Sequence, residues 1–322
     1  MKSHRKLISS IMVLAIMWST ICSVAFADNN TAKTQQATNT LLESGFTLEE
    51  ICELIPEHEL ASYAEVGPAI SLSEVFLKVS VDDETGEVSV VEMEEEDCQE
   101  AAAVVQNLRK NMVQQNEPLN TRTIDNDIGG HDDRNTSDGY MRMIVSAYPY
   151  LPYPDENGNR RLKVAGQFIW LVVPSERHVN VAALGHSTDV NQLGGSNDFS
   201  FEYTADIVST VNGSIVETYT ANKSDIITQC VNDGGTAVSF ELYEDGVIGG
   251  TVSSNHRIYL SYDVETSETT TSTASVFADY YYQSVGLSFS PSLSFPAGAS
   301  LSITPSIYYI RMSPNAYKGF YT

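Results

Sequence analysis

Apolar and polar residues alternate with a period of two along most of the second half of the chain. The clearest runs cover residues 199–207, 238–243 and 258–264. Such alternation is typical of strands that bury one face and expose the other, as antiparallel sheets do. Gly, Asn and Asp residues that favour turns separate the runs. The pattern therefore predicts an antiparallel β-sandwich of about ten strands over residues 140–322.

Two segments of this region depart from simple alternation. Residues 161–173 end in an unbroken apolar run over residues 168–173, which predicts a central strand buried on both faces. Residues 286–311 alternate apolar residues with uncharged Ser and Thr in two arms around Gly298. We expect these arms to form a C-terminal hairpin.

The N-terminal part of the chain has a mixed pattern. Thr47 and Glu50 have the spacing of a capping box, and apolar residues at helical spacing follow them. A predicted hairpin over residues 75–91 and a second predicted helix over residues 97–115 come next. We therefore expect a small acidic α+β unit at residues 45–116, preceded by a flexible leader at 28–44 and followed by an acidic linker at 117–139.

The first 27 residues have the organisation of a secretory signal peptide. A basic start and an apolar centre lead to Ala25-Phe26-Ala27, which is a small-x-small cleavage site of bacterial style. We expect cleavage after Ala27 and a secreted, extracellular protein; an uncleaved membrane anchor is the alternative. No second apolar segment of spanning length follows, so we expect no permanent membrane span after cleavage.

Charge narrows the classes of partner. The chain has 18 Lys and Arg against 42 Asp and Glu, a net charge of −24. Its first 27 residues contain three of the bases and none of the acids, so the remainder has a net charge of −27. Such a field repels nucleic acid and anionic lipid head groups, so we expect neither to be a partner.

Three cysteines follow the signal segment: Cys52, Cys98 and Cys230. An odd number in an exported protein leaves at least one of them outside any intramolecular disulfide. A Cys52–Cys98 bridge is one interpretation, because both residues fall in the N-terminal part. Buried thiols are the other interpretation.

Tyrosines gather at two places where strands meet loops. Exposed tyrosine binds sugars by stacking and is common in protein interfaces, whereas strand propensity alone explains the same residues. In a run of three on a strand, at least one should face outward. The candidate binding residues are Tyr148, Tyr150, Tyr153, Tyr280, Tyr281 and Tyr282.

The acidic linker contains a candidate Ca²⁺ site. Asp125, Asp127 and Asp133 offer carboxylate oxygens in a glycine-containing loop. The spacing does not fit an EF-hand, because Thr136 occupies the position of its final glutamate. A solvated linker is the alternative, and we expect no other cofactor.

Motifs that carry chemistry are few. His58 and Glu59 begin like H-E-x-x-H, but Ser62 stands where the second histidine belongs. Cys230 could pair with His186 or His256, but no nucleophile signature surrounds it. Glu202 with Asp206, and Glu241 with Glu244 or Asp263, are carboxylate pairs of the kind that sandwich glycosidases use.

The leading hypothesis is therefore a secreted or surface-associated, non-enzymatic protein that binds a protein or a carbohydrate. One alternative is a secreted glycoside hydrolase built on the sandwich. Another alternative is a membrane-active β-pore former, indicated by Ser/Thr-rich residues 265–275 and by hairpin arms at 286–311 that are long enough for membrane strands.

Overall fold

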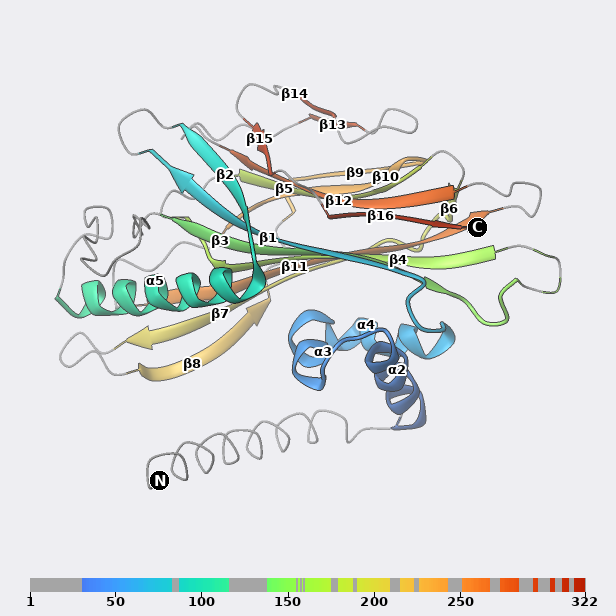
Figure 1. Ribbon diagram of the computed structural model, residues 1–322, viewed down its shortest axis with the longest axis horizontal. Helices are drawn as coiled ribbons and strands as arrows, with labels where there is room; N and C mark the ends of the chain where they lie inside the picture. The colour runs from blue at the N-terminus through green and yellow to red at the C-terminus, as the bar shows by residue number, and fades with distance from the viewer. Residues whose placement is uncertain are drawn as a thin grey trace. The chain divides into compact units, whose positions relative to one another are not determined.

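The computed structural model (Figure 1) describes residues 31–82, 87–115, 138–154, 156, 158, 160–174, 179–187, 190–208, 215–222, 226–242, 251–266, 273–283, 292–294, 302–304, 309–312 and 316–321. The chain divides into two compact units, Met1–Ala69 and Ile70–Thr322. The predicted signal peptide lies outside the described residues.

The first unit is helical. It contains α2 (Thr31–Glu43), α3 (Leu48–Leu54), α4 (Glu57–Leu60) and the 3-10 helix η1 (Ala61–Glu65). The predicted capping box is confirmed: the Thr47 side chain accepts from the Glu50 N–H, and the Glu50 carboxylate accepts from the Thr47 N–H. The expectation of a flexible leader is wrong from Thr31 onward. Helix α2 forms there because Ala37 and Leu41, one helical turn apart, are both fully buried.

The boundary between the units falls earlier than the sequence pattern predicted. Strand β1 (Ser71–Val81) pairs with β2 (Val88–Met93) as the expected hairpin. However, β1 also pairs along its length with β3 (Gly139–Pro149), which places the hairpin in the sheet of the second unit. A single α+β unit at 45–116 is therefore not what forms, because Leu77 and Val79 of β1 need the large core of the sheets to be buried.

The second unit is mainly β and antiparallel, as predicted. Its larger sheet has eight strands in the order β2-β1-β3-β4-β11-β7-β8, with β6 beside β11. The remaining strands of this sheet are β4 (Arg160–Val172), β6 (Asn191–Gln192), β7 (Asp198–Val208), β8 (Ile215–Asn222) and β11 (Thr251–Thr266). Strand β4 lies between β3 and β11 and is mostly buried, which confirms its prediction as a central strand.

The second sheet has six strands in the order β15-β12-β5-β10-β9, with β16 beside β12. Its strands are β5 (Val179–His186), β9 (Thr228–Asn232), β10 (Gly235–Glu241), β12 (Thr273–Gln283), β15 (Tyr309–Arg311) and β16 (Ala316–Tyr321). Strands β13 (Ser292–Ser294) and β14 (Ser302–Thr304) form a separate two-stranded sheet from the predicted C-terminal hairpin. The described strands exceed the expected number because several are short pieces that alternation does not reveal.

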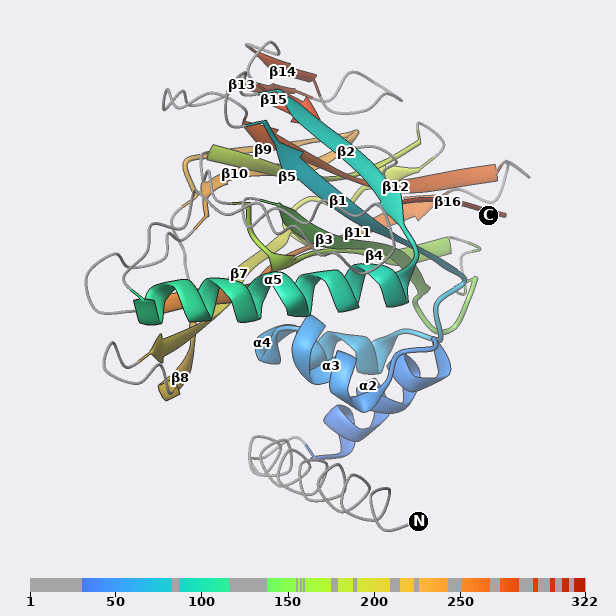
Figure 2. The same cartoon turned by 60° about the vertical axis from the view of Figure 1, so that its left-hand side comes forward.

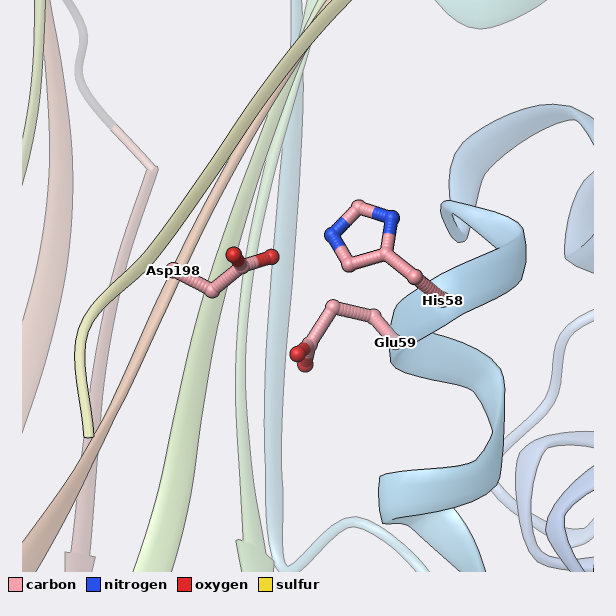
Figure 3. A group of neighbouring side chains, drawn as sticks. All are labelled: His58, Glu59 and Asp198. Atoms are coloured by element: carbon pink, nitrogen blue, oxygen red, sulfur yellow. The ribbon is translucent and has the colours of Figure 1, made fainter.

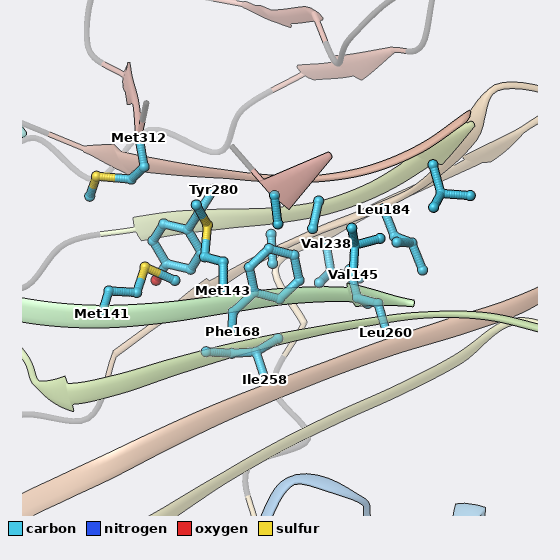
Figure 4. Packing of buried hydrophobic residues seen from close by; sticks show 14 of the residues in the cluster. Met141, Met143, Val145, Phe168, Leu184, Val238, Ile258, Leu260, Tyr280 and Met312 are labelled. Carbon is cyan, nitrogen blue, oxygen red and sulfur yellow. The ribbon is translucent and has the colours of Figure 1, made fainter. Parts of the chain in front are cut away.

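A shared apolar core joins the two large sheets. The larger sheet contributes Met143 and Phe168, and the six-stranded sheet contributes Leu184 and Val238 (Figure 4). Each of these side chains is fully buried. These residues come from strands that are far apart in the sequence. They meet in one core because alternate residues of each strand point to the same face of its sheet.

Each large sheet is also covered on part of its outer face. Helix α5 (Glu95–Gln115) runs along the eight-stranded sheet (Figure 2) and buries Cys98 and Val105 against Phe76. Its Arg109 donates from Nη1 to the carbonyl of Val173 at 2.6 Å. The β13–β14 sheet covers the six-stranded sheet, where Ile303 is buried in one cluster with Val181, Ala183, Ala237, Phe277 and Tyr281.

Candidate functional site

Tyr150, Arg161 and Asp263 meet at one end of the eight-stranded sheet. The Tyr150 hydroxyl donates to Oδ1 of Asp263 at 2.9 Å. Arg161 forms an ion pair with the other carboxylate oxygen of Asp263. The Arg161 guanidinium also lies over the Tyr150 ring, 4.2 Å from its centroid. The three side chains therefore form one connected cluster with a cation–π contact.

Strand register explains why residues so far apart in sequence come together. Lys163 of β4 faces Asp263 of β11 and Tyr148 of β3. Arg161 and Tyr150 lie two residues further along their strands, so their side chains project from the same face of the sheet. The Tyr150 N–H donates to the Arg161 carbonyl at 2.9 Å, which extends the pairing beyond the end of β3. The cluster is thus fixed by backbone pairing.

Exposure differs sharply within the cluster. The Asp263 side chain is 8% exposed, whereas that of Arg161 is 46% exposed. Partial burial tends to lower the pKa of Arg161, but its hydrogen bond to Asp263 and the negative charge of that residue outweigh burial and raise the pKa. Arg161 therefore stays charged at the surface, above a buried carboxylate that holds it in place.

The adjoining turn adds an apolar side chain. Leu151 directly follows Tyr150 and is 61% exposed. Tyr153 is half-buried, and burial raises the pKa of its hydroxyl. It packs against the core between the two large sheets. We call Tyr150, Leu151 and Arg161, with Asp263 in contact with Tyr150 and Arg161, the Tyr150 surface. It combines an aromatic ring, a cation and an exposed aliphatic side chain.

The other predicted tyrosines are buried. Tyr148 is fully buried, and so are Tyr280 and Tyr282, which face the core beside Trp170. The expectation that one residue of the 280–282 run faces solvent is wrong. Tyr281 does point away from the core, but the β13–β14 sheet covers it and leaves it 8% exposed. Among the predicted tyrosines, Tyr150 and Tyr153 thus keep some surface for a ligand.

The predicted carboxylate pairs do not converge in the described residues. Glu202 lies on β7 of the larger sheet and forms an ion pair with Arg257 at 3.4 Å. Glu241 lies at the end of β10 in the other sheet. The side chain of Asp206 lies outside those described. A groove with converging acids would have indicated an enzyme.

Acids do line one open hollow, of about 630 Å³, beside β1 and β2. Glu74 there is occupied by an ion pair with Arg142. Glu95 and Asp97 belong to the first turn of α5, where negative charge favours the helix dipole. These acids are therefore explained by local structure without a substrate.

The candidate metal ligands of the sequence lie in separate parts of the chain. Asp125, Asp127 and Asp133 lie outside the described residues. His58 and Glu59 lie on α4 in the first unit, and Asp198 begins β7 in the second (Figure 3). We describe each with its own unit and assign no site to the three together. Ser62 stands where the second histidine of H-E-x-x-H belongs, and its hydroxyl donates to the carbonyl of Glu59 at 2.6 Å.

The described cysteines carry thiols, and no disulfide joins Cys52 to Cys98. Burial raises the pKa of the Cys98 thiol to about 12. Cys230 packs against the outer face of the six-stranded sheet, whereas His186 reaches Tyr262 in the core and His256 stacks on Tyr203. A thiol–imidazole pair with Cys230 therefore does not form with either histidine.

Among the described residues, no helix combines the length and apolar character that crossing a membrane requires. The sequence reasoning found Tyr150, named Asp263 only as a possible carboxylate partner of Glu241, and missed Arg161. Nothing local shows that these three residues meet, because their meeting depends on which strands are neighbours. The charge of Arg161 two residues before Lys163 was the one visible sign of a polar face at the start of β4.

Comparisons with known proteins identify no family. No family model matches the sequence, and no curated protein matches it. Among solved structures, the chain is similar to a "Pore forming protein" at 9% identity and a TM-score of 0.25, over 58% of this chain and 92% of that one. It is also similar to the Clostridium perfringens NetB toxin in its membrane inserted form, at 10% identity and a TM-score of 0.16, over 56% and 89%. Both TM-scores are too low to bear on the fold or function of this chain.

Proposed function

We propose that the protein is a secreted, non-enzymatic interaction protein that binds a protein partner through the Tyr150 surface. The observation that supports this best is the half-exposed Arg161 guanidinium stacked over the Tyr150 ring, next in sequence to the exposed Leu151. Tyr and Arg contribute more often than other residues to protein–protein hot spots. The buried Asp263 orders both of them before any partner arrives, which lowers the entropic cost of binding.

The charge of the chain indicates the kind of partner. The net charge after residue 27 is −27, so a partner with a basic surface is attracted over a long range. Secretion rests on the signal peptide expected at residues 1–27. The paired state of Glu202 and Glu74 supports a non-enzymatic function, because both carboxylates already neutralise an arginine.

A binding assay tests the proposal. The chain without residues 1–27 is fluorescently labelled, and its binding to cultured animal cells, bacterial cells and insoluble polysaccharides is measured. Leu151→Asp should lower binding to a protein-bearing surface by about tenfold or more, because it places a charge in the apolar part of the interface. The matched control is Val91→Asp, since Val91 is 57% exposed on β2. Equal binding by both variants, or no binding by the unaltered chain, would contradict the proposal; binding to polysaccharide alone would indicate a carbohydrate ligand.

A second candidate function is membrane activity through the C-terminal hairpin. The specific observation is that β13 and β14 pair only with each other among the described strands, outside both large sheets. Their sheet is held to the protein by the side chains of Ile303 and Leu293 on an apolar face. Detachment of the β13–β14 sheet from the six-stranded sheet would therefore break apolar contacts but no pairing between described strands. It would expose apolar surface on both of these sheets.

A disulfide lock tests this candidate. Leu293 of β13 and Cys230 of β9 border the same cluster, so Leu293→Cys provides a thiol next to the native one. Dye release from phosphatidylcholine liposomes should stop in the oxidised variant and return on reduction. Leu293→Ser is the matched control, because it removes the same side chain without adding a thiol. The candidate fails if the unaltered chain releases no dye or if the oxidised lock releases it equally.

A further inference from the structure

The six-stranded sheet has an apolar patch on its outer face, which the β13–β14 sheet covers. In Figures 1 and 2 this small sheet lies beyond the six-stranded sheet, on the side away from the eight-stranded sheet. Ile303 of β14 is 6% exposed in the patch, and Leu293 of β13 packs against it. No described strand of the large sheets pairs with β13 or β14. Among the described residues, apolar side-chain contacts therefore attach the small sheet, as they would attach a lid.

Asp279 of β12 places a carboxyl group within this apolar patch. It lies between Phe277 and Tyr281, two members of the patch, and alternate residues of a strand point to the same face. Its neighbour across the pairing with β5 is Ala183, another member of the patch. The Asp279 side chain is 0% exposed. A carboxylate is thus buried in the surface that the small sheet covers.

Arg311 of β15 supplies the opposite charge. Its Nε and Nη2 donate to Oδ1 of Asp279 at 3.0 and 2.5 Å. The Arg311 side chain is 40% exposed, so the carboxylate end of this ion pair lies in the interior and the guanidinium end reaches solvent. Burial tends to lower the pKa of Arg311, but the charge of Asp279 and the hydrogen bond to it outweigh burial and raise the pKa. Arg311 therefore remains charged.

Unequal burial makes the two charges act differently on the small sheet. A carboxylate loses its hydration when it is buried, and an ion pair offsets that loss only while the partner is in place. If the small sheet leaves the patch, water gains access to Asp279 and the hydration is recovered. The carboxylate of Asp279 therefore favours detachment, whereas Arg311 favours the attached state.

We propose that the β13–β14 sheet is a lid on the six-stranded sheet, closed by apolar contacts and opened by the buried charge of Asp279 when Arg311 no longer compensates it. The lid rests on the detachment that the second candidate function requires, and it adds the two residues that regulate detachment. Loss of the contact between Arg311 and Asp279 is the step that releases the small sheet.

Alkylation of Cys230 measures the opening of the lid. Cys230 of β9 packs against the same apolar patch, whereas Cys98 of α5 is buried against the other sheet. The chain without residues 1–27 is treated with iodoacetamide, and mass spectrometry gives the labelling rate of each cysteine. Arg311→Met should raise the rate of Cys230 by about tenfold or more, because it leaves the buried carboxylate without the charge of Arg311. Cys98 should stay unlabelled, which shows that the rest of the protein remains folded.

Asp279→Asn separates a regulated lid from an ordinary ion pair. This variant keeps the shape of the side chain and removes the charge that favours opening, so Cys230 should be labelled no faster than in the unaltered chain. Added to Arg311→Met, it should remove most of the increase in rate. Lys318→Met is the matched control, because Lys318 is exposed on β16, which also pairs with β12, and its loss should not change the rate.

Three results overturn the proposal: an unchanged Cys230 rate in folded Arg311→Met, a faster rate in Asp279→Asn than in the unaltered chain, or an equal increase in Lys318→Met. If labelled Cys98 shows that Arg311→Met is unfolded, the rate in Asp279→Asn decides, because an ordinary ion pair predicts an increase there.

Dye release from phosphatidylcholine liposomes separates the lid from the second candidate function. If Arg311→Met opens the lid and the liposomes retain their dye, the lid is confirmed and membrane activity fails. Dye release without any change in the Cys230 rate supports membrane activity and overturns the lid.

Discussion

Trp170 of β4 donates its indole N–H to the hydroxyl oxygen of Tyr280 of β12 at 2.9 Å, in the core between the two large sheets. The two rings meet edge to face, with centroids 5.7 Å apart. Both side chains are fully buried. A directional bond inside an apolar core restricts how the sheets can slide against each other, because an indole N–H without an acceptor there costs about 1–3 kcal/mol.

Replacing Tyr280 with Phe should therefore lower the free energy of unfolding by about 1–3 kcal/mol, because the indole loses its acceptor. Urea unfolding followed by tryptophan fluorescence measures this. The chain has two tryptophans, Trp18 and Trp170, so a chain without residues 1–27 reports Trp170 alone. The emission of the folded variant should also shift. Unchanged stability and emission would contradict a bond between the two residues.

The buried imidazole of His186 should make the protein sensitive to mild acid. Burial lowers the pKa of His186 to about 4, and its Nδ1 lies 3.0 Å from the Tyr262 hydroxyl. An unfolded histidine has a pKa of about 6.5. As the pH falls between these values, the unfolded chain binds a proton that the folded chain does not, so stability falls by roughly 3 kcal/mol.

His186→Gln removes this titration. The free energy of unfolding of the variant should therefore fall less than that of the unaltered chain as the pH is lowered through this range. The measurement is urea unfolding of both chains at several pH values, because carboxylates common to both cancel in the difference. Parallel stability curves across the range would show that His186 does not contribute.

The thiol of Cys98 should resist alkylation in the folded protein. Its pKa, raised to about 12 by burial, leaves almost no thiolate at neutral or mildly alkaline pH. Iodoacetamide followed by mass spectrometry should label Cys98 only after unfolding. Label on Cys98 in the folded chain, or a Cys52–Cys98 cross-linked peptide without reductant, would contradict the buried thiol.

Within the Tyr150 surface, the tyrosine hydroxyl should matter more to stability than the arginine charge. Tyr150→Phe removes a donor from the buried Asp263 carboxylate and should cost about 1.5–3 kcal/mol. Arg161→Met should cost less than about 1 kcal/mol, because the side chain is 46% exposed and solvent screens its charge. Urea unfolding of both variants measures the two losses. A larger loss for Arg161→Met would show that the ion pair holds Asp263 instead.

Features that depend on nearby residues were predictable from the sequence. Thr47 and Glu50 cap α3 through bonds that span three residues. Alternation along β7, β10 and β11 predicted the strands themselves, although β10 and residues 258–264 of β11 are buried on both faces. The apolar run 168–173 predicted that β4 is central. Helix α5 follows from apolar residues one turn apart with acids at its start. Each of these depends on a periodicity that the backbone imposes within a few residues.

Only the tertiary structure decided which strands are neighbours and what covers each face. Alternation cannot show that β1 pairs with β3, although α5 lies between them in the sequence. It cannot show either that Arg161 meets Asp263, about a hundred residues later in the chain. It also cannot show that Tyr281, on the outer face of β12, is buried by Ile303 of the hairpin. The sequence by itself determined which residues alternate; the partner of each strand was decided by the burial that the complete core offers, because backbone hydrogen bonds are equally available to every strand.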